Sequence, residues 1–197
     1  MPAANHRDDR RVRMTRRLIK DSFLTLLRQK NIAKITVKDI CLGADINRAT
    51  FYAHYESVYD LLHKMEDELA ENICTILKLD NTPSLDMTVT NCQALLEHIK
   101  AHEEFCMVVI NLSGDTYFQD RIMALIGEPT VQLLEQTLHL PQEDARLYLV
   151  YQFAGYFAII REWVATGMIR SITDMARLMT ELSPFSHQTP KESAAIL

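Results

Sequence analysis

The segment Thr36–Tyr55, TVKDICLGADINRATFYAHY, constrains the fold of this chain more than any other feature. Thr36 can cap a helix, because its hydroxyl can accept a hydrogen bond from a free N–H group of the first turn. Four apolar residues then recur at helical spacing: Val37, Ile40, Cys41 and Ala44. Asp45 and Ile46 form a corner, and Asn47 can cap a second helix. The pattern predicts two short helices around a tight turn, which is a helix-turn-helix.

The second helix of this pair has two different faces. Phe51 and Tyr55 are large aromatic residues, and we expect both to point into the core. The outward positions carry short or hydrogen-bonding side chains and one guanidinium: Arg48, Ala49, Thr50, Tyr52 and His54. Such a face suits a helix that lies against a groove of DNA.

The longer segment ITVKDICLGADINRATFYAHYESVYDLL resembles the DNA-binding motif of the tetracycline-repressor (TetR) family. The Thr-Phe-Tyr-x-His-aromatic run at residues 50–55 is its most diagnostic part, and residues 16–27 resemble the first helix of the family. The resemblance covers residues 11–71. The remainder is similar to the family only as an all-helical regulatory domain.

The resemblance implies a role for individual residues. Arg48 matches a position that reads base edges, where arginine can pair bidentately with guanine. Ala49 is small enough for close approach of the helix. Phosphate contacts are implied for Thr50, Tyr52 and His54, and contacts at the start of the preceding helix for Thr36 and Lys38. The predicted DNA-binding set is therefore Thr36, Lys38, Asn47, Arg48, Ala49, Thr50, Tyr52 and His54.

One position departs from the family pattern. The family commonly places a phosphate-binding lysine near the start of the next helix, and this chain has Val58 there. A charged phosphate contact is thus missing, which puts the affinity for DNA in doubt more than the function. Val58 is also the one sequence feature that favours an alternative, a regulator that has lost strong DNA binding and acts by docking to another protein.

Charge is segregated along the chain. Residues 1–64 carry thirteen Lys and Arg and seven Asp and Glu, a net charge of +6, whereas residues 65–197 carry eight and nineteen, a net charge of −11. A basic N-terminal region favours contact with a polyanion, and an acidic remainder should point away from DNA. We expect residues 1–10 to form a disordered basic arm. It is either a solvated tail or a segment that follows the phosphate backbone or enters the minor groove.

Apolar periodicity predicts an all-α chain. We expect a first helix at 12–30 that buries Leu18, Ser22, Phe23, Leu26 and Leu27. A long helix should follow from Ser57 and stop at Asp80–Pro83. The later helical segments are 84–102, 105–112, 115–138 with an interruption at Gly127 and Pro129, 141–166 and 171–182. The predicted organisation is an arm (1–10), a helix-turn-helix domain (11–71, with the motif at 35–54), a helical regulatory and dimerisation domain (72–182) and a flexible tail (183–197).

The helix expected at 141–166 is apolar on more than one face between Leu147 and Ile160. A helix that is apolar almost all round must be covered on nearly every side, and a small domain cannot supply all of that cover. We therefore expect a homodimer joined through residues 141–182, as the resemblance also implies.

Other functions find little support in the sequence. It has no GxSxG, P-loop, GxGxxG or HExxH motif, so we do not expect an enzyme or a cofactor. His98, His102 and Cys106 are spaced to line one helix face and could hold a metal, but Glu103–Phe105 predicts a helix break between them, and we expect no metal site. The four cysteines lie in apolar patterns and should be buried, reduced thiols of a cytoplasmic protein. The longest charge-free stretch, residues 147–160, is shorter than the ~18–20 residues of a membrane span.

These observations predict a transcriptional regulator, most simply a repressor, that binds a palindromic operator as a homodimer. The resemblance allows a small-molecule effector in the C-terminal helical domain, whose binding residues the sequence does not identify. It also leaves open the operator sequence, the regulated genes and the choice between repression and activation.

Overall fold

The computed structural model describes residues 3–77, 88–111 and 116–183, and all of the secondary structure in these ranges is helical. The chain divides into two compact units, Met1–Glu66 and Asp67–Leu197, called here unit 1 and unit 2. The division falls inside one long helix, α4 (Val58–Ile76), which therefore contributes residues to both units. The described helices confirm the predicted all-α class.

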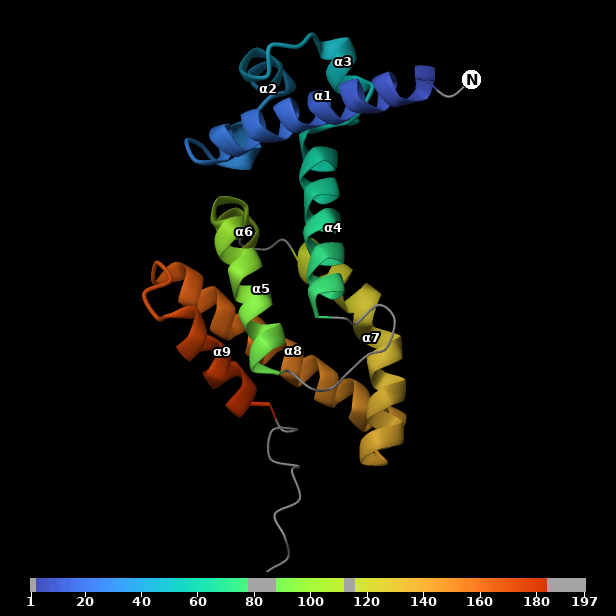
Figure 1. The fold of residues 1–197 in the computed structure, drawn as a ribbon, viewed down its shortest axis with the longest axis vertical. Helices are drawn as coiled ribbons and strands as arrows, with labels where there is room; N and C mark the ends of the chain where they lie inside the picture. The colour runs from blue at the N-terminus through green and yellow to red at the C-terminus, as the bar shows by residue number, and fades with distance from the viewer. Residues whose placement is uncertain (1–2, 78–87, 112–115, 184–197) are drawn as a thin grey trace, which may run out of the picture. The chain divides into compact units, whose positions relative to one another are not determined.

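Unit 1 contains α1 (Ala3–Leu27), the short 3-10 helix η1 (Ile32–Lys34), α2 (Val37–Gly43), α3 (Arg48–Tyr52) and the first half of α4. Helix α2 packs against both α1 and α3, and Figure 1 shows these helices at the N-terminal, blue end of the colour range. Six of the described side chains of the unit are completely buried: Ile19, Phe23, Ile40, Phe51, Leu61 and Leu62. They come from α1, α2, α3 and α4, so the core is shared among the four α-helices.

Helix α1 differs from the sequence prediction at its beginning. It starts at Ala3, whereas we expected a disordered arm over residues 1–10 and a helix from Val12. No glycine or proline lies between Ala3 and Leu27, so nothing in the backbone stops the helix from extending through the polar segment. The predicted buried face is confirmed in part. Ser22 and Phe23 are buried and Leu26 and Leu27 are half-buried, whereas Leu18 is 38% exposed and Ile19, which was not predicted, is fully buried.

A close contact fixes the packing of α1 on α2. The hydroxyl of Ser22 on α1 donates a hydrogen bond to the carbonyl oxygen of Ile40 on α2, over 2.9 Å. A Cβ atom added to Gly43 would lie only 2.4 Å from Ser22 Oγ. Glycine at position 43 therefore makes room for the serine hydroxyl between the two helices.

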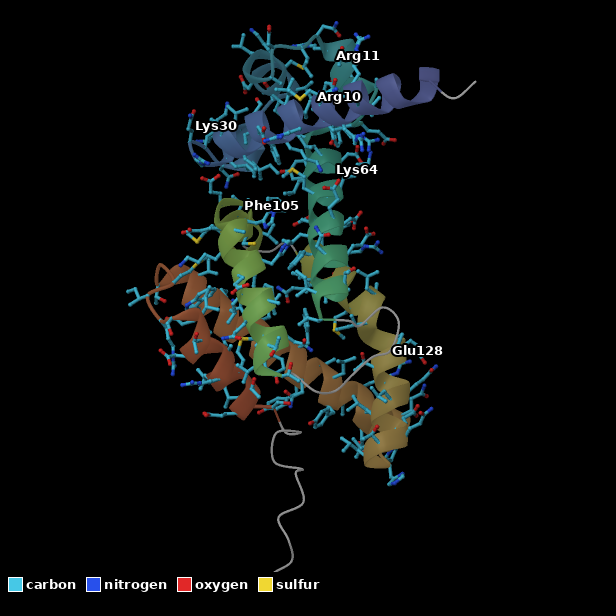
Figure 2. All side chains as sticks on the ribbon, in the orientation of Figure 1. Arg10, Arg11, Lys30, Lys64, Phe105 and Glu128 are labelled. Carbon is cyan, nitrogen blue, oxygen red and sulfur yellow. The ribbon has the colours of Figure 1, made fainter. Side chains whose placement is uncertain are left out.

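Unit 2 contains the second half of α4 together with α5 (Val89–Ala101), α6 (Glu103–Asn111), α7 (Tyr117–Leu138), α8 (Gln142–Ala165) and α9 (Ile172–Glu181). Within this unit α5 packs along α9, and α7 packs along α8, as Figure 1 shows. A buried apolar cluster joins α7 to α8 through Val131, Leu134, Ala145 and Leu149. Glu128 of α7, labelled in Figure 2, also pairs with Arg146 of α8 at 3.0 Å.

Helix α7 corrects a second prediction. We expected an interruption at Gly127 and Pro129, and the structure has one continuous helix from Tyr117 to Leu138. A proline inside a helix removes one backbone hydrogen bond and costs about 3 kcal/mol. The buried residues of α7, which are Phe118, Ile122, Ile126, Val131 and Leu134, form one apolar face on both sides of the proline. Their burial, at about 1.5–3 kcal/mol each, outweighs the local cost.

The end of α8 follows the sequence prediction closely. Gly167 has a φ of +75°, in the left-handed region that glycine adopts without strain. The N–H of Met168 then donates to the carbonyl of Trp163 over 2.8 Å, which closes the helix end. The indole N–H of Trp163 donates to the carbonyl of Arg170 over 2.9 Å and fixes the turn towards α9.

Other expectations are met in part or lie outside the described residues. Cys41, Cys74, Cys92 and Cys106 are buried and form no disulfide, as predicted. The predicted helix stop at 80–83 lies outside the described residues, as do the start of the segment expected at 84–102 and the predicted tail from residue 184 onwards. Among the described helices, none is long and apolar enough to cross a membrane.

Candidate nucleic-acid interface

The start of α2 is held by a reciprocal set of hydrogen bonds. The N–H of Asp39 donates to Thr36 Oγ1 (3.2 Å), and the N–H of Thr36 donates to Asp39 Oδ2 (3.1 Å), which is a capping box. Lys30, just beyond α1, donates to the same carboxylate oxygen over 2.7 Å. The hydrogen bond from Lys30, together with those from Thr36, lowers the pKa of Asp39 to about 2. The predicted cap is confirmed, and it is tied to the end of α1.

The turn between α2 and α3 uses a residue in the left-handed region. Asp45 has a φ of 52°, a conformation that aspartate tolerates better than most residues. The N–H of Ile46 donates to the carbonyl of Cys41 over 3.0 Å, which terminates α2. The chain can therefore reverse within the few residues between α2 and α3.

The cap of α3 is also as predicted, and it occupies two residues of the predicted DNA-binding set. Asn47 Oδ1 accepts hydrogen bonds from the N–H of Thr50 (2.8 Å) and from the hydroxyl of Thr50 (3.0 Å). A hydroxyl has a single proton, and phosphate oxygens only accept hydrogen bonds. Thr50 must therefore give up its bond to Asn47 before it can donate to a phosphate, so its role in holding the cap competes with a DNA contact.

The two faces of α3 are separated as the sequence predicted. Phe51 is fully buried and Tyr55, just after the helix, is 3% exposed, whereas Tyr52 is 56% exposed. Arg48 and Ala49 are exposed as well, at the N-terminal end of the helix. On α2, Thr36 and Lys38 are also exposed. The structure therefore presents the predicted contact residues of α2 and α3 at the surface of unit 1.

His54 lies at the C-terminal end of this face and is half-buried. Burial lowers the pKa of His54, and the positive charge of Arg16 on α1 lowers it further. Both effects favour the neutral ring, which offers one N–H donor instead of a full positive charge.

A network that the sequence analysis missed fastens α3 to α4. Asp60 Oδ2 accepts hydrogen bonds from the N–H of Glu56 (2.8 Å) and from Lys64 Nζ (2.8 Å). The same ammonium donates to the carbonyl oxygen of His54 (3.3 Å) and lies 5.4 Å from the ring centroid of Tyr55. A positive charge at the C-terminal end of a helix stabilises its free carbonyls. The i, i+4 spacing of Asp60 and Lys64 was the available sequence signal.

The departure at position 58 has a clear structural consequence. Val58 is 8% exposed, so its side chain packs into the core of unit 1 at the position where the family pattern has a lysine. Ser57 accepts a hydrogen bond from the N–H of Asp60 over 3.0 Å and caps α4 immediately before Val58. The positive charge near the start of α4 comes instead from Lys64, one helical turn after Asp60.

The N-terminal half of α1 adds positive charge to unit 1. Five arginines occur between residues 10 and 17, and all five are exposed: Arg10, Arg11, Arg13, Arg16 and Arg17. Figure 2 shows Arg10 and Arg11 on this part of α1, with Lys30 beyond its opposite end. Together with the exposed face of α3, these side chains give unit 1 a surface of guanidinium, ammonium and hydroxyl donors, which suits a polyanion.

The metal-site hypothesis gains no support from the geometry. The rings of His98 and His102 lie 4.3 Å apart, at the end of α5. Cys106 is on the next helix, α6, where burial raises the pKa of its thiol to about 12 and opposes the thiolate that a metal needs. Within the described ranges, no three His, Cys, Asp or Glu side chains are grouped to hold an ion.

The fold and the exposed α2–α3 pair define a helix-turn-helix regulator with a separate helical unit. Residues 90–184 match the family model TetR_C_8, a transcriptional regulator C-terminal region. The fold is similar to that of a TetR transcriptional regulator from Streptococcus agalactiae 2603V (TM-score 0.62, 20% identity, 91% of this chain and 98% of that chain). It is also similar to the fatty acid degradation regulator FadR of Bacillus halodurans (TM-score 0.59, 16% identity, 85% and 93%).

A sequence relative agrees with this assignment. The chain is 38% identical over 77 residues to the uncharacterized HTH-type transcriptional regulator YxbF of Bacillus subtilis strain 168. The match covers 39% of this chain and 20% of the length of that protein. The chain is thus a TetR-family transcriptional regulator, a member of a DNA-binding and non-enzymatic family.

Proposed function

We propose that this regulator binds a palindromic DNA operator as a homodimer and represses transcription in the cytoplasm. The observation that carries the proposal is the amphipathic character of α3, whose Phe51 is fully buried while Arg48, Ala49 and Tyr52 face solvent. A helix held by its aromatic residues can enter the major groove without losing its packing. Arg48 would then read base edges, and Tyr52 and His54 would donate to phosphates.

The exposed face of α8 supports the homodimer. Leu147 is 69% exposed and Tyr151 is 74% exposed, with Val150 beside them at 54%. Exposed Ala154 and Ala158 continue the same face at helical spacing. A contiguous apolar surface of this kind marks an interface, and a second copy of the chain offers a surface that matches it. A two-fold dimer would present two copies of α3, which is why we propose a palindromic operator.

Helix α4 supports a mechanism by which a structural change in unit 2 reaches the DNA-binding unit, unit 1. Asp67 of α4 pairs with Arg121 of α7 (2.9 Å) and accepts a hydrogen bond from Tyr117 (3.2 Å). Glu71 pairs with the same guanidinium at 3.1 Å. The other half of α4 carries core residues of unit 1. A small-molecule effector in unit 2 that moves α7 would therefore act on α4, and we propose this as the way in which the regulator leaves its operator.

The test is the binding of purified protein to a duplex from the region upstream of its own gene. With ~6–10 phosphate contacts, affinity should fall by ~10³–10⁵ between about 50 and 200 mM salt. The upstream duplex should also bind more tightly than a scrambled duplex of equal length. Weak binding that is equal for both duplexes at every salt concentration would overturn the proposal.

That negative result would favour the alternative, a regulator that docks to another protein. The specific observation behind the alternative is Val58, which is buried in the core and leaves no cation at the position where the family has a phosphate-binding lysine. The variant Val58→Lys, which places a positive charge at this position, distinguishes the DNA-binding function from the docking function. If Val58→Lys keeps the fold and creates strong DNA binding where the wild type has none, the docking function is the better description.

A further inference from the structure

The N-terminal half of α1 carries a dense group of exposed positive charges that the helix-turn-helix does not use. Among the side chains that the structure describes, which begin at residue 10, only Arg17 of these five arginines faces a carboxylate, that of Asp21 at 3.7 Å, and both side chains are well exposed. Five like charges within eight residues repel one another when no anion is present. The segment is nevertheless helical, so the backbone fixes the direction in which each side chain leaves the helix.

Most of these arginines share one side of the helix. At about 100° per residue, Arg10, Arg13, Arg16 and Arg17 lie within an arc of roughly 120°, whereas Arg11 lies about 100° outside that arc. Arg16 is at the edge of the arc nearest the core, one helical turn before the fully buried Ile19, and its charge also acts on His54 at the end of α3. The arc therefore begins beside the end of α3 and extends around α1 away from the core.

The length of the arc indicates what it can contact. From Arg10 to Arg17 the helix rises about 10 Å, at about 1.5 Å per residue. One DNA strand presents a phosphate every 3.4 Å or so along the axis, so about three phosphates lie within this length. A helix about 10–12 Å across does not fit a minor groove about 6 Å wide. A helical α1 therefore cannot act as a minor-groove arm. Since α3 would occupy the major groove, the phosphate backbone is the contact that remains for α1.

We propose that the α1 face formed by Arg10, Arg13, Arg16 and Arg17 is a second DNA contact. It binds about three phosphates next to the groove that α3 enters, independently of their sequence. The inference rests on the proposed function, because it assumes that α3 faces DNA. It supplies from α1 the charge that the family pattern places at position 58.

The experiment compares arginines on and off this face. Fluorescence anisotropy would follow binding to a labelled upstream duplex and to a scrambled duplex over a salt series, with Arg13→Gln, the double variant Arg10→Gln/Arg13→Gln and the control Arg11→Gln. We expect the slope of log affinity against log salt to fall by about 0.9 for the single variant and by about 1.8 for the double variant. Affinity for both duplexes should fall by the same factor, and Arg11→Gln should leave the slope unchanged.

Two results would overturn the inference while leaving the proposed function intact. The double variant could keep the wild-type slope on the duplex that the wild type binds, or Arg11→Gln could lower the slope as much as Arg13→Gln does. Failure of the wild type to bind any duplex would overturn both proposals together. All of the replaced side chains are exposed, and Arg10→Lys/Arg13→Lys, which keeps the charges, should retain the wild-type slope.

Discussion

The contact between Gly43 and Ser22 makes a quantitative prediction about the helix-turn-helix unit. In the substitution Gly43→Ala, the new Cβ would lie 2.4 Å from Ser22 Oγ and 3.3 Å from Ser22 Cβ. The hydroxyl can escape only by leaving its hydrogen bond to Ile40, which contributes about 0.5–1.5 kcal/mol. Overpacking of this kind costs about 1–3 kcal/mol, against about 0.5–1 kcal/mol gained when alanine replaces glycine in a helix. We expect a net destabilisation of about 1 kcal/mol.

The effect of Gly43→Ala on stability should change from destabilising to stabilising when Ser22 is replaced by alanine. In Ser22→Ala the hydroxyl is absent, so Gly43→Ala in that background should stabilise unit 1 by about 0.5 kcal/mol through helix propensity. The coupling between the two sites would then be about 1.5 kcal/mol, within the range for residues in contact. Amide hydrogen exchange in α2 measures the local free energy of opening in each of the four proteins.

A glycine elsewhere in the chain provides the matched control. Gly127 lies inside α7, and no atom lies within 4 Å of a Cβ built there. Gly127→Ala should therefore stabilise α7 by about 0.5–1 kcal/mol in either background. If Gly43→Ala destabilises α2 by the same amount with and without the serine hydroxyl, the close contact is not the cause and our account of this packing is wrong.

Three further predictions concern other parts of the chain. The pKa of Asp39 is about 2 in the folded chain against 3.8 ordinarily, so its stabilising effect is complete above pH 4 and is lost as the pH falls towards 2. Thermal melts of wild type and Asp39→Asn should therefore converge over that interval, and a constant difference would contradict the assignment. Lys64→Met removes the ion pair with Asp60 and the charge at the end of α3. In urea melts it should lower the free energy of unfolding by about 0.2–1 kcal/mol. An unchanged free energy would show that this network does not contribute to stability. Tyr151→Glu should yield monomers in light scattering, because it places charges in the proposed α8 interface. The control Gln136→Glu, on the exposed side of α7, should remain a dimer. A dimeric Tyr151→Glu protein would place the interface elsewhere.

The parts of the fold that the sequence predicted are those fixed by local chemistry. The caps at Thr36 and Asn47 depend on a few adjacent residues, and both are found in the structure. The errors arise where distant packing decides. The continuity of α7 past Pro129 depends on apolar contacts along its whole length, and a local reading of the proline cannot weigh them.

The candidate site shows the same difference between features that adjacent residues determine and features that three-dimensional packing determines. The exposed face of α3 follows from its helical spacing and its buried aromatic residues, so sequence periodicity was enough to predict it. The contact of Lys64 with the carbonyl of His54 joins residues ten positions apart across a turn, and only the geometry shows it. The bond between Thr50 and Asn47, which competes with a phosphate contact, likewise depends on a side-chain rotamer that no sequence pattern specifies.

The central claim is that α3 reads DNA sequence through Arg48, and the most direct test compares Arg48→Ala with Tyr52→Phe on the upstream and scrambled duplexes. Arg48→Ala should cost ~1–3 kcal/mol on the upstream duplex and reduce its preference over the scrambled one. Tyr52→Phe removes only a hydroxyl that would contact phosphate, so it should weaken both complexes equally and leave their ratio unchanged. Equal losses on both duplexes for Arg48→Ala would make Arg48 a phosphate contact and contradict the placement of α3 in the groove.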